Sequence, residues 1–274
     1  MYKLQIIIFI SFLTALFSCE DVIQIDLNSA DPQIVIDAVV TDQSGPYTIK
    51  INKTGDYFEP SVFPAVCGAV VQITDDAGSF ETLQETEPGI YRTDSLQGIP
   101  GRTYTLTVIS EGAEYTATSC MPEAIQIDSL RYEYQPGSSF GPDKEEGYKL
   151  HVHFTDRAGI EDYCRFKVFK NGQLIKGFYL YEDKYTDGNS ADYSDFEDEA
   201  GGIFDLNDTA YVELLTIDKA THKYYSTINN VLAEAATEPP FMSVTPANPN
   251  TNLSNSALGY FGAFTVRADS IIIQ

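Results

Sequence analysis

The sequence predicts a mainly β protein made of two β-sandwich domains, the second of which carries one amphipathic helix. Three observations predict this fold class. Short segments of alternating polar and apolar residues follow one another from Gln33 onward, separated by turn residues. One stretch alone, near residues 222–236, has helical spacing instead. Hydrophobic residues make up 43% of the chain, which is enough to form a buried core.

The first sandwich is predicted over residues 33–121. About seven strands in roughly 90 residues match the size of one immunoglobulin-like sandwich. The residues Asp75-Asp76-Ala77-Gly78 supply a turn in which glycine is available for positive φ. We expect strands at residues 33–41, 46–51, 69–74, 79–84, 89–92, 103–109 and 114–119.

The second sandwich is predicted over residues 122–274, after a boundary at residues 121–124. Asn171-Gly172 predicts a hairpin, because both residues tolerate the positive φ of a two-residue turn. We expect strands at residues 127–134, 148–154, 163–169, 210–217 and 260–266, the last continuing through 271–273 to complete the second sheet.

One helix is predicted near residues 222–236, packed on the second sandwich. Its apolar residues recur three or four positions apart, which is the helical period. Pro239-Pro240 ends the pattern because proline cannot continue a helix. The recurring residues are Tyr225, Ile228, Leu232 and Ala235.

The amino terminus has the pattern of a secretory signal peptide, predicted over residues 1–18. Lys3 precedes an apolar run of the length of a signal h-region, too short to span a bilayer comfortably. Leu16-Phe17-Ser18-Cys19 then matches a bacterial lipobox, in which the cysteine is lipidated and becomes residue 1 of the mature chain. We therefore expect a lipid on Cys19 and a tether over residues 19–32. The alternative is an ordinary signal peptide with an incidental cysteine.

The charge of the chain excludes nucleic acid as the expected partner. The chain carries 40 acidic and 17 basic side chains, for a net charge of −23. Phosphate backbones are bound by Lys and Arg, which are the minority here. An acidic surface favours solubility, divalent cations or basic partners.

Three cysteines remain if Cys19 is lipidated. Cys67 and Cys120 flank the later strands of the first domain, and a disulfide between them is one reading. Cys164 alternates with Phe166 and Val168 onto one face, which favours a buried free thiol. There is no CxxC motif, which excludes a zinc ribbon or a thioredoxin-like centre.

Two groups of residues are candidates for metal binding, although each has a simpler reading. His151 and His153 share one strand face, where an acid such as Asp156 can supply a third ligand. The simpler reading is a half-exposed strand with Leu150, Val152 and Phe154 inward. Residues 183–199 are rich in oxygen ligands suited to calcium, but their spacing departs from a calcium-loop motif. The candidate ligands are His151, His153, Asp187, Asp192 and Asp195.

No pattern of an enzyme is present, and we expect a protein without catalytic residues. The chain lacks G-x-S-x-G, H-E-x-x-H, Walker A and G-x-G-x-x-G motifs. Eighteen tyrosines without any tryptophan leave carbohydrate stacking open, against the ordinary abundance of aromatic residues in strands. The candidate tyrosines are Tyr132, Tyr134, Tyr179, Tyr181, Tyr185 and Tyr193.

Several sequence pieces occur in a fixed order along the mature chain. They are CEDVIQIDL, IVIDAVVTD, GAVVQITDDAG, PGIYR, GRTYTLTV and YTATSCMP, followed by IDSL, DYCRFKVFKNG, AYVELLTID, KYYSTINN and NLSNSALGYFGAF. On these pieces the chain resembles the Bacteroidetes lipoproteins grouped as domain of unknown function 4249. Cys164 departs from the family, which more often has an aromatic residue there. The first domain also resembles carboxypeptidase-regulatory or transthyretin-like sandwiches.

The resemblance implies an outer-membrane lipoprotein that assists a TonB-dependent receptor, since such proteins are often encoded beside one. The resemblance does not point to any particular enzymatic activity. We expect binding through loops and exposed edges, and Glu20-Asp21 after the lipidated cysteine favours the cell surface over the periplasmic face. The alternatives are a structural or adhesive surface module and a calcium- or glycan-dependent binder.

Overall fold

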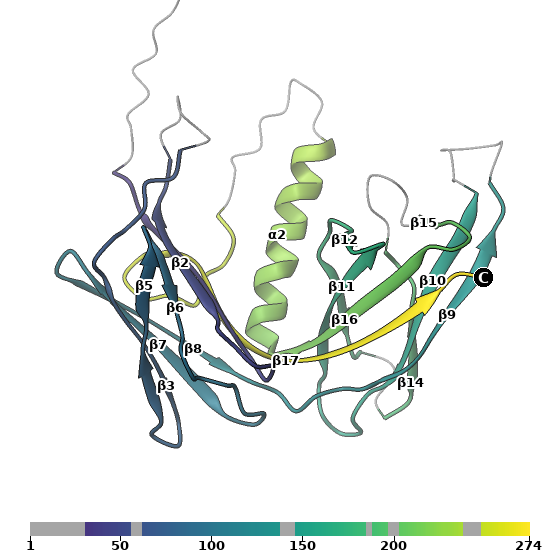
Figure 1. The fold of residues 1–274 in the computed structure, drawn as a ribbon, viewed down its shortest axis with the longest axis horizontal. Coiled ribbons are helices and arrows are strands. Elements are labelled where there is room, and N and C mark those ends of the chain that lie inside the picture. The colour runs from purple at the N-terminus through teal and green to yellow at the C-terminus, as the bar shows by residue number, and fades with distance from the viewer. Residues whose placement is uncertain (1–30, 56–61, 138–145, 185–187, 197–202, 238–247) are drawn as a thin grey trace, which may run out of the picture. The chain divides into compact units, whose positions relative to one another are not determined.

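The strands of the described residues form three sheets, and the largest joins strands from both halves of the chain (Figure 1). The computed structural model describes residues 31–55, 62–137, 146–184, 188–196, 203–237 and 248–274. The longest sheet has nine strands, of which β13 (Tyr179–Glu182) pairs with β11 beside the main path. The order along that path is β12 (Gln173–Leu174), β11 (Tyr163–Lys170), β16 (Thr209–Ile217), β17 (Leu258–Ile272), β1 (Ile34–Thr41), β2 (Thr48–Lys53), β6 (Ile90–Arg92) and β5 (Gln84–Glu87).

Two four-stranded sheets accompany the long one, and the predicted mainly β fold is confirmed. One has the order β4 (Phe80–Thr82), β3 (Val70–Asp75), β7 (Thr103–Ser110) and β8 (Ala113–Cys120). In the other, β10 (Gly147–Thr155) pairs with β9 (Ile127–Gln135), β14 (Ser190–Tyr193) and β15 (Ile203–Phe204).

The predicted Asn171-Gly172 hairpin is confirmed. The turn joins β11 to β12, with Asn171 at φ 51° and Gly172 at φ 80°. These positive values are those of the two-residue turns that match the twist of a hairpin. Asn171 is also tied to β16, because its side-chain oxygen accepts a hydrogen bond from the Thr209 N–H at 2.9 Å.

The long strand β17 joins two parts of the chain that the sequence places in separate sandwiches. Residues 258–264 pair in parallel with β1, from Val35↔Leu258 to Thr41↔Phe264. Residues 265–272 pair antiparallel with β16. The C-terminal strand was expected to complete the second sheet alone. It instead links both halves, as the yellow arrow in Figure 1 shows.

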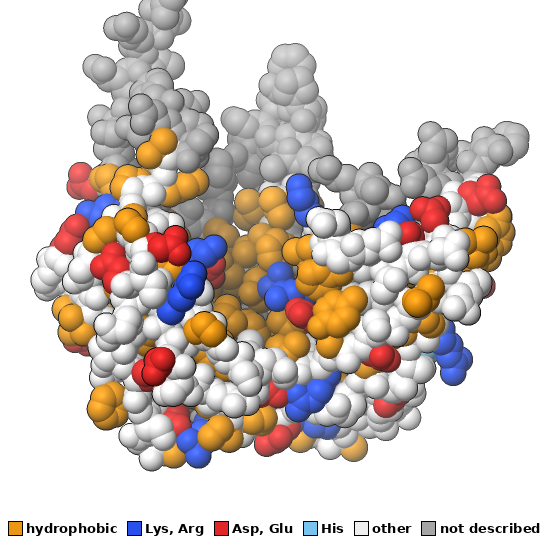
Figure 2. Space-filling view, in the orientation of Figure 1, with side chains coloured by type: hydrophobic (Ala, Val, Ile, Leu, Met, Phe, Trp, Pro, Cys, Tyr) orange, Lys and Arg blue, Asp and Glu red, His pale blue; other side chains and the backbone are white. Residues whose placement is uncertain are grey.

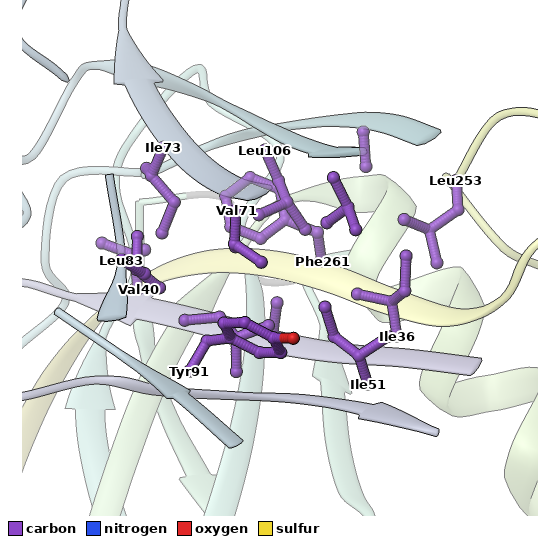
Figure 3. Packing of buried hydrophobic residues seen from close by; sticks show 14 of the residues in the cluster. Ile36, Val40, Ile51, Val71, Ile73, Leu83, Tyr91, Leu106, Leu253 and Phe261 are labelled. Carbon is purple, nitrogen blue, oxygen red and sulfur yellow. The ribbon is translucent and has the colours of Figure 1, made fainter. Parts of the chain in front are cut away.

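The first core lies between the β1–β2–β6 part of the long sheet and the sheet that contains β3 and β7. Figure 3 shows Ile36, Ile51 and Tyr91 facing Val71 and Leu106, with Phe261 of β17 among them. All are fully or almost fully buried, because alternate residues of each strand point inward. This is the two-layer packing that defines a sandwich.

The second core lies between β10 and the β11–β16 part of the long sheet. Phe154 and Phe166 meet there with ring centroids 5.7 Å apart. The first core is built mainly from residues 34–121, and the second from residues 125–273. However, four residues assigned to the second sandwich pack in the first core: Leu253, Ala257, Phe261 and Ala263.

The predicted helix is confirmed as α2 (Lys219–Thr237), which begins three residues earlier than expected. Asp218 caps it, because its Oδ1 accepts a hydrogen bond from the Thr221 N–H at 2.7 Å. The other oxygen, Oδ2, accepts hydrogen bonds from the Ser119 hydroxyl and the Cys120 N–H. One aspartate therefore starts the helix and ties it to β8.

Candidate functional site

A pocket of about 330 Å³ lies between α2 and one face of the long sheet. Strands β1, β11 and β17 supply its floor, and α2 and Phe178 supply its walls. Figure 2 shows a hollow lined by hydrophobic side chains where Figure 1 draws α2 and β17. The volume is at the lower end of the range for small-molecule sites, which is about 300–1,000 Å³.

Three residues of α2 face the pocket because of their helical spacing. Tyr224, Tyr225 and Ile228 fall on one side of the helix, and all are half-buried. Asn229 of α2 donates a hydrogen bond to the Phe178 carbonyl at 2.7 Å, and the Phe178 ring stacks on that of Tyr225 at 5.3 Å. These two contacts tie Phe178 to the helix.

Arg165 is the cation of the pocket. Its guanidinium carbon lies 4.1 Å from the ring centroid of Tyr225 and 4.8 Å from that of Phe178. Its Nε is buried and has no hydrogen-bond partner, and no carboxylate among the described residues forms an ion pair with it. Three other arginines of the chain each pair with an aspartate: Arg102 with Asp75, Arg157 with Asp162 and Arg267 with Asp42.

The tyrosines of the pocket are neutral at physiological pH. Tyr224 and Tyr260 stack with ring centroids 4.4 Å apart and an interplanar angle of 16°. Burial raises the pKa of Tyr224 to about 12 and also raises the pKa of Tyr260. Burial likewise raises the pKa of Tyr225, although the Arg165 charge opposes this shift. The charged side chains of the lining are therefore Arg165 and Asp37 alone.

The structure brings together three of the residues proposed as metal ligands. Strand β14 pairs with β10 so that Asp192 lies opposite His153. Both Asp192 oxygens lie 3.1 Å from His151 Nδ1, and Asp192 Oδ1 lies 3.9 Å from His153 Nε2. Leu150, Val152 and Phe154 are buried, which confirms that the histidines lie on the outward face.

No metal centre follows from this group. Across the described parts of the chain, no three His, Cys, Asp or Glu side chains are arranged to hold a metal ion. Asp195 contributes its backbone carbonyl to the Tyr193 hydroxyl at 3.3 Å, and Asp187 lies outside the described residues. His151 Nδ1 and the Asp192 carboxylate contact each other, which explains why these side chains lie together.

The disulfide considered possible between Cys67 and Cys120 is not present in the structure, in which both thiols are free and exposed. Cys67 lies just before Val70, the first residue of β3, and Val70 pairs with Ile109 near one end of β7. Cys120 pairs with Thr103, at the other end of β7. Six residues of a strand span roughly 20 Å, and a disulfide needs Cα atoms within about 7 Å. Cys164 is a buried free thiol, as predicted.

Four of the tyrosines considered for carbohydrate stacking pack in or against the second core: Tyr132, Tyr179, Tyr181 and Tyr193. Phe196 contacts Tyr179 and Tyr193, with ring centroids 5.3 Å and 5.0 Å away. Tyr132 and Tyr134 each make an edge contact with Tyr148, and Tyr185 lies outside the described residues. The open aromatic surface of the α2 pocket comes from residues that the tyrosine pattern did not single out.

Sequence reasoning missed Arg165, although a signal for its direction exists. Cys164, Phe166 and Val168 alternate into the second core, so Arg165 must point to the opposite face of β11. The sequence does not show that α2 covers that face.

Asp156 is a buried carboxyl group with an unfavourable environment. It is 4% exposed, it forms no ion pair with the described Lys, Arg or His side chains, and its carboxyl lies beside that of Asp183. Burial raises its pKa, and the adjacent Asp183 carboxyl raises it further, because two carboxylates repel and one shared proton relieves this.

We expect Asp156→Asn to stabilise the fold at pH 7 by about 1–3 kcal/mol, since it removes a buried unpaired charge. The folded-state pKa of Asp156 is raised, so its destabilising effect is present at neutral pH. The effect fades as the pH falls through that raised pKa toward the unfolded value of about 3.9. The advantage of the variant over wild type should fade over the same range. Urea denaturation at pH 7 and near pH 4 measures both effects.

Asp162→Asn is the matched control for this prediction. Asp162 is equally buried, but its carboxylate accepts hydrogen bonds from the Arg157 backbone N–H at 2.8 Å and the Arg157 Nε at 3.0 Å. Its replacement should destabilise the protein at pH 7. A loss of stability in Asp156→Asn as well would contradict the assignment of Asp156 as an unpaired charge.

The fold and the pocket together define a class: a mainly β sandwich protein whose described part has one helix and a cavity of small-molecule size. The chain belongs to the family described as a domain of unknown function (DUF4249), which matches residues 20–270. This confirms the predicted domain of unknown function 4249. A search of curated proteins found no match to the chain. Within the described residues, no helix is both long enough and apolar enough to cross a membrane.

Proposed function

We propose that this chain is a lipid-anchored outer-membrane protein that binds a small ligand in the α2 pocket without catalysis and assists a TonB-dependent uptake system. The observation that carries the binding role is Arg165, a half-buried cation beside aromatic rings with no carboxylate partner among the described residues. A cation that is already fixed in position and has no carboxylate partner can bind an external anion at a low cost in ordering. We therefore add this preformed pocket to the loops and exposed edges that the sequence predicts as binding surfaces.

The anchor and the location rest on the sequence. Cys19 follows the apolar run and the Leu-Phe-Ser triplet of a lipobox, and it lies outside the described residues. Full acylation adds more than one chain to such a cysteine, which is what stable anchoring requires. Glu20 and Asp21 support placement on the cell surface. The chain's family supports the uptake role only through its resemblance to lipoproteins encoded beside transporters.

Purification of the lipoprotein from solubilised outer membranes tests the location and the partner. Wild type should incorporate an alkyne-labelled fatty acid and remain with the membrane, whereas Cys19→Ser should do neither. Cross-linking should recover a TonB-dependent receptor barrel with wild type. Repeated recovery of the chain alone would reject the partner and favour a structural or adhesive module. A shift in melting temperature with calcium or oligosaccharide would favour a calcium- or glycan-dependent binder.

A further inference from the structure

The guanidinium of Arg165 lies beside two aromatic rings and forms no ion pair with a carboxylate of the described residues. Its carbon atom lies over the rings of Tyr225 and Phe178, whose centroids are 5.3 Å apart, and the Tyr225 hydroxyl accepts a hydrogen bond from the guanidinium. A guanidinium has five N–H donors, so donors remain for a carboxylate, which can accept two hydrogen bonds from it. The buried Nε–H has no acceptor among the described residues.

The charge of the lining discriminates between anions. Arg165 and Asp37 contribute one positive and one negative charge, while the three tyrosines are neutral. A dianion such as phosphate would face one cation and a repelling aspartate. A monocarboxylate meets one cation, and a hydroxyl or ammonium group on the same ligand can donate to Asp37.

The other residues of the lining determine what kind of ligand body fits the pocket. Val39 and Ile228 add apolar surface beside the aromatic rings, in a cavity of about 330 Å³. A flat body with an apolar face can lie against these rings. Both an aromatic acid and a sugar acid have such a face.

We propose that the α2 pocket binds a small organic monocarboxylate, with its carboxylate paired to Arg165 and its flat body against the aromatic wall. This inference rests on the proposed binding function and names the ligand class of that site. Aromatic acids and sugar acids share the recognised chemistry, and the test separates them.

The test is isothermal titration of the detergent-solubilised full-length lipoprotein with two matched pairs of probes. The pairs are 4-hydroxybenzoate with 4-hydroxybenzamide, and glucuronate with glucose. At least one acid should bind, and at least tenfold more tightly than its neutral partner. Arg165→Gln should weaken that acid at least tenfold. Arg131→Gln, which changes an exposed arginine of β9 outside the pocket, should bind like wild type.

The comparison of each acid with its neutral partner uses wild-type protein, so it stands even if Arg165→Gln misfolds. Equal binding of acid and neutral partner would overturn the carboxylate assignment while leaving ligand capture by the pocket intact. Tighter binding of inorganic phosphate than of both acids, or no binding of either acid, would also overturn it. Failure of the lipidation or receptor experiments affects the proposed function alone, because those experiments do not involve the pocket.

Discussion

Gly259→Ala is expected to destabilise the protein by about 2–5 kcal/mol, because two separate costs coincide at this residue. Gly259 has φ +90°, where side chains other than glycine are strained, and a Cβ there would lie 2.1 Å from the Ile36 carbonyl oxygen. The residue pairs with Ile36 in the parallel contact of β1 with β17. The added methyl group would therefore push apart the pairing that joins the two halves of the long sheet. Urea denaturation of the two proteins measures the loss.

Gly112→Ala is the matched control, since it has the same kind of backbone without the close approach. Gly112 has φ +79° in the turn between β7 and β8, and a Cβ there would meet nothing within 4 Å. The strain alone should cost roughly 1–2 kcal/mol. Equal losses in the two variants would show that the contact with Ile36 adds nothing.

Phe261→Ala and Phe166→Ala should each destabilise the fold by about 3–5 kcal/mol, one in each core. Both rings are fully buried, so truncation loses apolar burial and leaves a cavity. Because β17 pairs with strands of both cores, each variant should lower the temperature of one shared unfolding transition. Roughly 2–4 °C per kcal/mol predicts a decrease of about 6–20 °C by calorimetry.

The conservative variants Phe261→Leu and Phe166→Leu should lose much less, which separates cavity formation from misfolding. Two separate transitions, with each alanine variant moving only one of them, would contradict the joining role of β17. That result would instead support two independently folded sandwiches with a boundary near residue 121.

Much of the local structure was predictable because it depends on near neighbours. Alternation identified the principal strands, Asn171-Gly172 identified a hairpin, and the spacing of Tyr225 and Ile228 identified α2. The short strands β14 and β15 were missed because they interrupt or follow an acidic segment whose composition indicates a loop. The helix start was placed late, because the capping role of Asp218 depends on a hydrogen bond rather than on apolar spacing.

The candidate site was predictable only in part. The two histidines and Asp192 do meet, but through the pairing of β10 with β14, which no local pattern specified. The disulfide failed for the same kind of reason, since flanking positions in a sequence do not show which end of a sheet a residue occupies.

Alternation within a strand determines which side chains point to the same face, and the sequence alone is sufficient to show this. It also means that Arg165 points away from the face of Phe166, although the sequence did not single Arg165 out. It did not choose the partner strand, because a strand offers the same backbone donors and acceptors to any neighbour. The parallel pairing of β1 with β17 joins residues more than 200 positions apart. Only that pairing, with α2 laid across it, brings Asp37, Arg165 and Tyr260 around one cavity.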